Sequence, residues 1–459
     1  MNLIRVFKLI KLKNNCTRRM ILTSIVQNKI RKYRDDKMAE NSELIERFFK
    51  YVKVDTRSSE TTETHPSTDK QKNLALILVS ELKEMGYSVD YDEEHCYIYS
   101  FIPSNNGNAD TPVIGFIAHM DTSPEVSDEN VKPRIIEYKG GDIELNKEKN
   151  IVMSSIDYKS LDNYIGQHLI VTDGTTLLGA DDKAGVAEIM QMAYDLSKHP
   201  EIKHGRIAIG FTPDEEIGEG PMFFDLKRFG ADFGYTVDGG PLGIIEYENF
   251  NAAQVRMIIH GRNVHPGSAK HIMKNSICIG NEFQNMLPTD QRPEVTEGYE
   301  GFYFLEKFEG TIEKTVMEYL IRDHDGKKFE DKKKLFLNAA EFMNRKYGEG
   351  TVEVYMKDAY YNMIEKMKDH MHLIDKAYEA LKNAGVEPSS EPIRGGTDGA
   401  ALSFKGLPCP NLCTGGENYH SRFEYACVES MEKTKEMLLG IVSLYEKETY
   451  DSLNEKISR

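Results

Sequence analysis

The sequence predicts an α/β protein whose main domain is built on a central, mostly parallel sheet, with a smaller ferredoxin-like module inserted in it. Strand-like and helix-like segments alternate along the first half of the chain, which favours a parallel sheet covered by helices. Apolar runs at 112–118, 206–212 and 233–237 are typical of strands buried on both faces. Residues 252–360 then follow the order strand, helix, strand, strand, helix, strand, which is that of a ferredoxin-like module.

Composition narrows the class of protein. With 459 residues the chain is long enough for two domains and a large core. No apolar run approaches the roughly 20 residues that a membrane span needs. The formal net charge of −16 argues against nucleic acid as a partner, because phosphate binding requires a basic surface. We therefore expect a globular protein that binds neither membranes nor nucleic acid.

The first 37 residues differ from the rest in charge. They carry eleven Lys or Arg against two Asp, a charge of +9, which leaves −25 for the remainder. One interpretation is a targeting segment or a nucleic-acid-binding tail. The other is a non-native or poorly ordered extension, with the domain starting at Met38. We expect the second, because helical patterning begins directly after Met38.

The six cysteines are scattered, without a CxxC pair or a dense framework. This usage fits a reducing cytoplasm, which is the predicted location. Cys409 and Cys413 could suggest a zinc pair. Pro410 and the apolar setting favour buried thiols instead.

The first elements belong to the main domain. Apolar residues at helical spacing predict helices at 43–52 and 69–85, and a strand follows at 96–102. Residues 124–170 are polar and irregular, which predicts a long excursion with a few short strands. From Asp182 onward the pattern is that of a helix packed on the sheet.

The second half holds the inserted module and the closing elements. We expect module strands at 252–260, 301–308, 315–322 and 351–360, and helices at 271–286 and 327–346. The alternative is that these strands continue the main sheet. The remaining elements are a helix at 374–384, a loop feeding a helix N-terminus at 392–400, a strand at 410–413 and a helix at 429–447.

Histidine and acidic side chains follow each of the three buried strands. They are His119 and Asp121 after the first, Glu215 and Glu216 after the second, and Asp238 after the third. Ligands of open α/β sheets bind outside the carboxyl ends of the strands, so we expect these side chains to meet. Taken alone, His119 could be a polar residue in a strand-end turn. Three strands with the same ending favour a common site.

Two adjacent acids, Asp181 and Asp182, stand where an apolar, Gly-containing segment meets a helix. Inward-pointing acids at such a junction are costly unless a positive partner meets them, and a divalent metal is the usual partner. Asp182 lies near the first helical turn, where a carboxylate suits the helix dipole. Asp181 has no such explanation and is the better ligand candidate.

These residues combine into a candidate metal centre. Its ligand set is His119, Asp181, Glu216, Asp238 and His420. Two imidazoles and three carboxylates suit a pair of zinc ions roughly 3.5–4 Å apart, with Asp181 as the natural bridge. Glu215 fits a general base for a metal-activated water, and Asp121 could orient His119.

Several segments resemble the peptidase T family, the tripeptide aminopeptidases of the co-catalytic zinc aminopeptidase/carboxypeptidase superfamily. The resemblance covers about residues 40–450, with the motifs in order. The motifs begin at His119 (HMDT), Leu178 (LGADDKAG), Thr212 (TPDEEIG), Val237 (VDGG), His265 (HPG), Ile321 (IRDHD), Arg394 (RGGTDGA) and Asn418 (NYH).

The resemblance implies a zinc-exopeptidase-like catalytic domain at 38–249 and 366–459, and a lid at 250–365 that carries dimer contacts, so a homodimer is expected. The basic extension has no counterpart in the family pattern. His265 on the lid is expected to help polarise the scissile carbonyl. The alternative is a turn histidine before Pro266.

The resemblance also implies a role for each residue of the metal centre. Two Zn²⁺ per subunit are expected, one held by His119 and Asp238, the other by Glu216 and His420, with Asp181 bridging them. Asp121 would orient His119, Glu215 would be the general acid and base, and the Asp181–Asp182 bond would be cis.

The predicted activity is release of the N-terminal residue from tripeptides. Arg322 and Arg394 lie in family-like motifs, and arginine recognises carboxylates in a bidentate way, so we expect them to hold the substrate's C-terminal carboxylate. Salt bridges to Asp323 or Asp398 are the alternative.

Two other classes of function are alternatives. A dipeptidase, a carboxypeptidase or an N-acyl-amino-acid deacylase would share the metal site, but the number of peptidase T-like motifs argues against them. A metal- or peptide-binding protein without catalysis has no need of a base such as Glu215.

Overall fold

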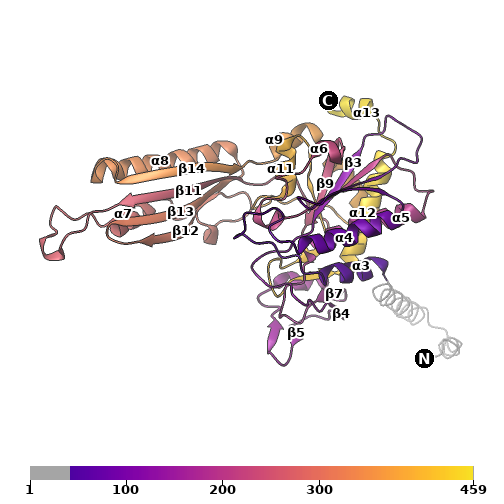
Figure 1. The fold of residues 1–459 in the computed structure, drawn as a ribbon, viewed down its shortest axis with the longest axis horizontal. Helices are drawn as coiled ribbons and strands as arrows, with labels where there is room; N and C mark the ends of the chain where they lie inside the picture. The colour runs from indigo at the N-terminus through magenta and orange to yellow at the C-terminus, as the bar shows by residue number, and fades with distance from the viewer. Residues whose placement is uncertain (1–41, 458–459) are drawn as a thin grey trace, which may run out of the picture.

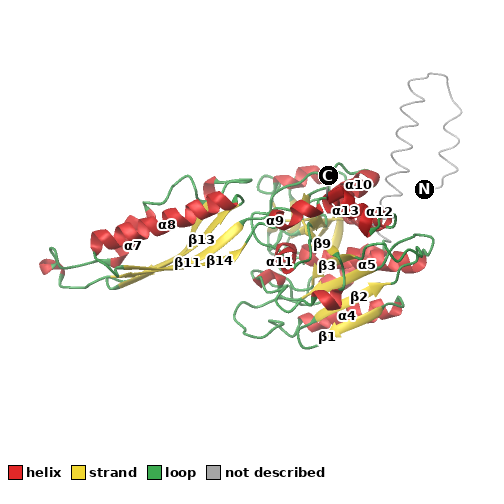
Figure 2. Ribbon diagram, turned by 90° about the horizontal axis from the view of Figure 1, so that it is seen from above, coloured by secondary structure: helices red, strands yellow, loops and turns green. Residues whose placement is uncertain are grey.

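A computed structural model describes residues 42–457, which form two parts (Figures 1 and 2). One is a broad α/β body, and the other is an elongated lid of residues 251–360 that projects from its side. The body is formed by the segments before and after the lid. The basic segment 1–37 lies outside the described residues, so both interpretations of it stay open.

The body is built on a seven-stranded sheet with the strand order β1-β2-β8-β3-β9-β15-β10. The four inner strands β8, β3, β9 and β15 run parallel, whereas the pairs at both edges are antiparallel. The strands span Ser88–Asp92 (β1), Tyr97–Ile102 (β2), Ile207–Thr212 (β8), Ile114–His119 (β3), Phe233–Gly239 (β9), Asn411–Cys413 (β15) and Ile245–Glu246 (β10).

The inner strands are buried because the sheet is covered on both faces. Every residue of β3 and β8 is buried, as their continuous apolar patterns predicted. Phe116 packs in the larger core on one face, whereas the next residue, Ile117, packs with Phe229 and Leu402 on the other.

Helices form both of these layers. On the larger face α5 contacts β3 and β9, with α3, α4 and α12 around it and α10 against α12; α6 and α11 cover the opposite face. The helices span Glu43–Val52 (α3), Gln71–Glu84 (α4), Ala180–Lys198 (α5), Leu226–Phe229 (α6), His372–Asn383 (α10), Asp398–Lys405 (α11) and Val428–Tyr445 (α12). The sequence did not predict α6, nor the short α9 (Ile364–Met367) and α13 (Tyr450–Ile457).

Residues 124–170 are more regular than their sequence suggested. Part of this segment joins a second, antiparallel sheet with the order β16-β17-β7-β4, and another part forms the hairpin β5-β6. These strands are Arg134–Glu137 (β4), Ile143–Asn146 (β5), Ile151–Met153 (β6), His168–Val171 (β7), Gly416–Glu417 (β16) and Tyr425–Cys427 (β17). Each has at most four residues, too few to show a periodicity, and β7 pairs with a strand from the far end of the chain.

The lid is a separate antiparallel sheet with the order β12-β13-β11-β14. Its elements are Asn251–His260 (β11), Ser276–Gln284 (α7), Phe302–Gly310 (β12), Lys314–Asp323 (β13), Gly326–Tyr347 (α8) and Val352–Tyr360 (β14). This is the ferredoxin-like order, so the predicted fold class is confirmed and the lid strands do not continue the main sheet. Helix α7 begins at Ser276, later than expected, because the Asn275 side chain caps it there. The domain boundaries at 250 and 365 stay a prediction.

Among residues 42–457, no helix combines the length and apolar character needed to cross a membrane. Cys409 and Cys413 are both buried and lie in different parts of the core, as expected of buried thiols.

Glu188 is a buried acid whose two carboxylate oxygens have no hydrogen-bond partner among residues 42–457. It lies on α5. Burial, then the neighbouring Cys413 and Glu432, raise the pKa of its carboxyl well above the usual range. The folded state therefore favours the protonated form, and stability is lost as the pH rises from the unfolded-state pKa, about 4.3, toward the folded-state value.

Replacing Glu188 with methionine is expected to stabilise the protein by about 1–3 kcal/mol at pH 7, because the buried unpaired oxygens are removed. The gain in thermal unfolding midpoint should be larger at pH 8 than at pH 5. Calorimetry at both pH values measures it, and an identical gain at both would contradict a raised pKa for Glu188.

Candidate active site

The residues predicted to form a metal centre meet at the carboxyl edge of the parallel strands. His119 is the last residue of β3, and Asp238 lies near the end of β9. Glu215 and Glu216 form the turn after β8, and Asp181 lies at the start of α5. Since β3 lies between β8 and β9, these side chains converge from three adjacent strands, the usual ligand position in open α/β sheets.

Asp181 lies between the two histidines. His119 Nε2 is 2.9 Å from Asp181 Oδ1 and 3.4 Å from Asp238 Oδ1. His420 Nε2 is 3.4 Å from Asp181 Oδ2 and 2.9 Å from Glu216 Oε2. Each imidazole thus has one carboxylate of its own, and both share the carboxylate of Asp181. This is the arrangement expected of two ion sites with one bridging ligand.

Asp121 connects the first histidine to the turn after β8. His119 Nδ1 lies 3.1 Å from the Asp121 carbonyl oxygen and 3.3 Å from its Oδ1. The same carboxylate accepts hydrogen bonds from the backbone N–H groups of Glu215, at 3.0 Å, and Glu216, at 3.2 Å. Asp121 therefore fixes the ring of His119 and the position of both glutamates together.

The two adjacent acids play different parts, and the peptide bond between them is cis. Asp182 lies close enough to His119 and Asp238 to be a ligand. Its Oδ2, however, accepts from the His119 backbone N–H at 3.1 Å, and its Oδ1 from that of Gly185 at 3.2 Å. Its carboxylate is therefore occupied by the backbone, which makes Asp181 the better candidate for a bridging ligand.

Glu424 is a residue of the site that sequence reasoning missed. Its carboxylate accepts from the backbone N–H groups of Leu178 and Gly179, both at 2.8 Å, and of Asp181, at 3.0 Å. It thereby holds the segment that presents Asp181. A possible signal was its place four residues after His420, but a single acid there has no characteristic pattern.

Negative charge accumulates in this cluster. Burial, followed by repulsion from Asp181, raises the pKa of Glu216 to about 8, and burial raises that of Asp238 to about 6. The pKa of Glu215 is also well above its usual value, because the side chain is buried and lies near Asp238 and Asp398. Within residues 42–457, no Lys or Arg forms an ion pair with these acids. A bound cation would supply the missing positive charge.

The donor set fits zinc. Imidazole nitrogens and carboxylate oxygens are ligands that zinc prefers. His119, Asp181 and Glu216 bring such atoms close enough to hold a metal ion, and so do His119, Asp182 and Asp238. Glu216 Oε1 is buried and has no hydrogen-bond partner in the described part of the chain, so its lone pairs are free for a ligand.

A cavity of about 750 Å³ opens beside this cluster, between the body and the lid. Asp181, Glu216, Asp238 and His420 line it, as does Glu215. The lid contributes Arg322 and Tyr360 to its wall. The cavity therefore places a base candidate, metal-ligand candidates and a cationic side chain around one space.

The three predicted substrate-binding residues are placed differently. Arg322 lines the cavity, and its Nε is buried without a hydrogen-bond partner among the described residues. The guanidinium of Arg394 instead donates to the carbonyl groups of Gly298 and Glu300 and to Thr296.

His265 is exposed and belongs to the loop that follows β11. Figure 1 shows this loop at the outer end of the lid. Its Nδ1 accepts from the backbone N–H of Gly267 at 3.1 Å. Of these three residues, only Arg322 is brought to the cavity within the single chain.

Comparison with known proteins supports the same interpretation. A family model described as a peptidase dimerisation domain matches residues 247–350, which include most of the lid. The chain is 56% identical over 404 residues to the peptidase T of Clostridium acetobutylicum, an alignment that covers 88% of this chain and 99% of the relative.

Solved structures agree in fold. An aminopeptidase PepT from Bacillus cereus has a TM-score of 0.70 at 25% identity, covering 88% of this chain and 98% of that one. A tripeptidase from Staphylococcus aureus has a TM-score of 0.70 at 22% identity, with the same coverage of 88% and 98%. The chain therefore belongs to the peptidase T family and is a metal-dependent aminopeptidase.

Proposed function

We propose that this protein is a dinuclear zinc tripeptidase, which removes the N-terminal residue from tripeptides. The observation that carries the proposal is the sharing of Asp181 by two imidazoles, each with its own carboxylate. His119 and Asp238 would hold one zinc ion, and Glu216 and His420 the other. The relatives named peptidase T and the neighbour named a tripeptidase support the substrate class.

The chain supplies the proton transfer and the orientation. When bound, the two ions would lower the pKa of a shared water and polarise the scissile carbonyl. Glu215 lines the cavity beside the ligands and would accept the proton of that water and pass it to the leaving amine. Asp121 holds the Glu215 backbone N–H at 3.0 Å, so the position of the base is fixed relative to His119.

A panel of dipeptides, tripeptides, tetrapeptides and N-acyl amino acids, each assayed with and without a chelator, tests the function. Fastest release of the N-terminal residue from tripeptides, abolished by the chelator and restored by Zn²⁺, is the expected result. Preference for dipeptides, for release of the C-terminal residue or for N-acyl amino acids would assign the shared metal site to another member of the superfamily. Absence of any hydrolysis would indicate a binding protein.

Arg322 is proposed to hold the C-terminal carboxylate of the tripeptide. Arg322 lines the cavity, whose wall also includes several acids, and its Nε is buried without a hydrogen-bond partner among the described residues. Because a hydrogen bond to a charged group is worth about 1.5–3 kcal/mol, Arg322→Ala should lower kcat/KM for tripeptides about 10–100-fold. Dipeptides, whose carboxylate ends elsewhere, should lose less. An equal loss on both would contradict the role in length selection, and Arg256→Ala, an exposed lid arginine, is the control.

Arg394 is proposed to hold Arg322 in place. Its carbonyl oxygen accepts from Arg322 Nη1 at 3.2 Å, while its own guanidinium holds the 296–300 loop. Arg394 would therefore position Arg322 and the lid loop rather than contact the substrate.

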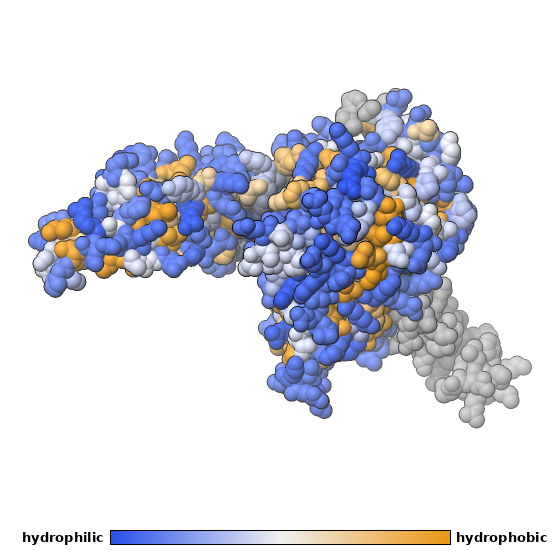
Figure 3. All heavy atoms as spheres, viewed as in Figure 1, coloured by the Kyte–Doolittle hydropathy of each residue, from blue (hydrophilic) through white to orange (hydrophobic). Residues whose placement is uncertain are grey.

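The lid is proposed to carry a homodimer interface. Large apolar side chains are exposed on it, among them Phe304, Phe308, Leu335 and Phe342, and Figure 3 shows apolar patches along the lid. The dimerisation-domain model that matches the lid supports this interpretation.

A role of His265 in catalysis would require that interface or a motion of the lid, because His265 lies outside the cavity of its own chain. Sedimentation should give twice the mass of one chain. His265→Ala should lower kcat by about 10²-fold if the ring helps polarise the carbonyl, without changing mass or metal content. Unchanged kcat would leave His265 as a turn residue.

A further inference from the structure

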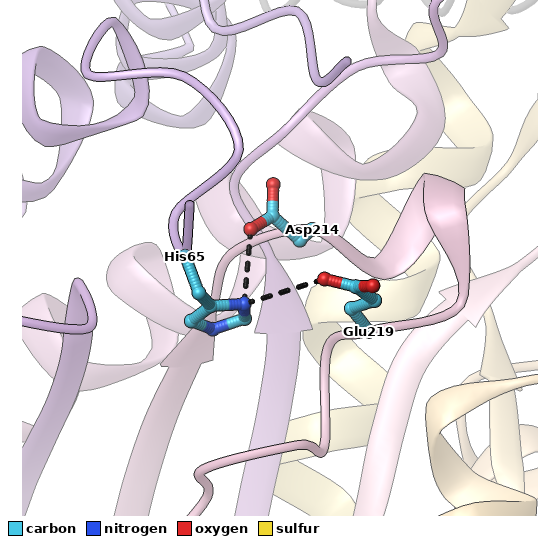
Figure 4. A group of neighbouring side chains, drawn as sticks. All are labelled: His65, Asp214 and Glu219. Atoms are coloured by element: carbon cyan, nitrogen blue, oxygen red, sulfur yellow. Dashed lines mark ion pairs between the residues drawn. The ribbon is translucent and has the colours of Figure 1, made fainter. Parts of the chain in front are cut away.

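His65, Asp214 and Glu219 form a second cluster of potential metal ligands (Figure 4). His65 comes from the loop between α3 and α4, and Asp214 and Glu219 flank the turn that carries Glu215 and Glu216. His65 Nδ1 is 3.2 Å from Asp214 Oδ2 and 3.8 Å from Glu219 Oε2. Both carboxylates point toward this one ring nitrogen (Figure 4).

The hydrogen bonds of Tyr97 show which nitrogen of His65 carries a proton. The Tyr97 hydroxyl donates its single proton to the Gly220 carbonyl oxygen at 2.7 Å and accepts from the Phe223 backbone N–H at 3.2 Å. His65 Nε2, 2.9 Å from this hydroxyl, must therefore be the donor in their contact. In the neutral ring, Nδ1 then turns a lone pair toward two carboxylates.

That arrangement is unfavourable unless something positive lies between the groups. The side chain of His65 is only 6% exposed and that of Asp214 is fully buried. Nδ1 has no hydrogen-bond partner within residues 42–457. No lysine or arginine of the described chain pairs with either acid, and burial lowers the pKa of the His65 ring, which opposes its protonation.

We propose that His65, Asp214 and Glu219 bind a divalent cation of the Zn²⁺ type at a site separate from the catalytic pair. One imidazole nitrogen and two carboxylate oxygens form a zinc donor set. Ligand bonds of about 2.0–2.2 Å separate two donors by at most about 4.4 Å, and the observed separations of 3.2 and 3.8 Å fall within that limit.

The surroundings match such a site. The Glu219 side chain is 41% exposed, so the cation can enter from solvent and water can complete its coordination. The Nε2–H bond to Tyr97 is the outer hydrogen bond that metal-bound histidines usually make. Asp214 also accepts from the Ser67 backbone N–H at 2.7 Å and from Gln71 Nε2 at 2.6 Å, which orients its carboxylate.

The consequence would be structural. The cation would join the 58–67 loop to the turn that begins at Asp214 and carries the proposed base and one zinc ligand. Asp214 has a left-handed backbone conformation with φ of 55°, so the turn depends on contacts from outside it. His65, Asp214 and Glu219 would then be positioning residues, with no contact to the substrate.

Metal content tests the proposal. Purified full-length protein, its Glu219→Gln and His65→Gln variants and the control Glu63→Gln are equilibrated with buffered free Zn²⁺ and analysed by plasma emission spectrometry. Both cluster variants should bind one molar equivalent less than the wild type and the control. Glu63 is an exposed acid two residues from His65, so it matches the change of charge.

The measurement is a difference, so it does not depend on how many ions the catalytic site holds. Because His65 is buried, its variant can misfold; partly exposed Glu219 carries the test, with circular dichroism confirming that the variant is folded. Equal metal content in the wild type, the control and a folded Glu219→Gln variant would overturn the proposal and leave His65 as an imidazolium paired with Asp214.

Discussion

Replacing Glu215 with glutamine is expected to lower kcat by about 10²–10⁴-fold, the usual contribution of a general base. The amide keeps the size of the side chain but cannot take up a proton. The backbone N–H of residue 215 is held by Asp121 in either case, so the position of the turn should not change. Steady-state kinetics on a tripeptide, with metal content measured on the same sample, gives the result.

Metal content is the control that makes this prediction specific. Glu215 is no ligand in the proposed centre, so the variant should bind as much zinc as the wild type. Exposed Glu93, replaced in the same way, should leave both kcat and metal content unchanged. Undiminished turnover in Glu215→Gln would refute the assignment, and loss of metal would make Glu215 a ligand instead.

The environment of Glu215 connects the proposed base to the proposed metal centre. Burial and the acids Asp238 and Asp398 raise its pKa well above the usual range in the protein without ions. A carboxyl held protonated cannot accept a proton. Cations beside Asp238 would offset this repulsion and lower the pKa toward the range in which Glu215 can act as a base.

The main elements and the candidate ligands could be predicted because their signals are local. The buried strands β3 and β8 are continuous apolar runs, and His119 and Glu216 lie at or just after their ends. Strand ends at one sheet edge must converge, so chain order and topology were enough to bring these residues together. The lid was predicted for a related reason, since its long strands and helices have clear periods.

The residues that sequence reasoning missed depend on contacts between distant segments. Glu424 supports Asp181 from 243 positions away along the chain. His65 meets Asp214 only because the loop before α4 folds against the turn after β8. Arg394, like Arg322, was expected to bind the substrate carboxylate, yet its guanidinium donates to the lid loop and only Arg322 lines the cavity. Sequence patterns contain no information on which of two similar side chains faces a cavity.

Asp181→Asn is expected to have the largest effect of any single substitution, with kcat/KM lowered at least about 10³-fold and zinc content reduced. Among the described residues, only Asp181 forms ion pairs with both His119, at 2.9 Å, and His420, at 3.4 Å, so both proposed ion sites would lose negative charge together. A substitution at Asp238, which approaches only His119, should weaken one site and leave the other.

Zinc titration of the Asp181→Asn protein measures this difference, with exposed Asp162→Asn as the control for charge. Weakened binding of both equivalents identifies Asp181 as the bridge. If one equivalent still binds with wild-type affinity, Asp181 belongs to a single site and the ions do not share it. Asp182→Asn distinguishes the role of Asp182 from that of Asp181. The carboxylate of Asp182 accepts hydrogen bonds from the backbone N–H groups of His119 and Gly185. The substitution should therefore lower the thermal unfolding midpoint, because two backbone N–H groups lose their carboxylate acceptor.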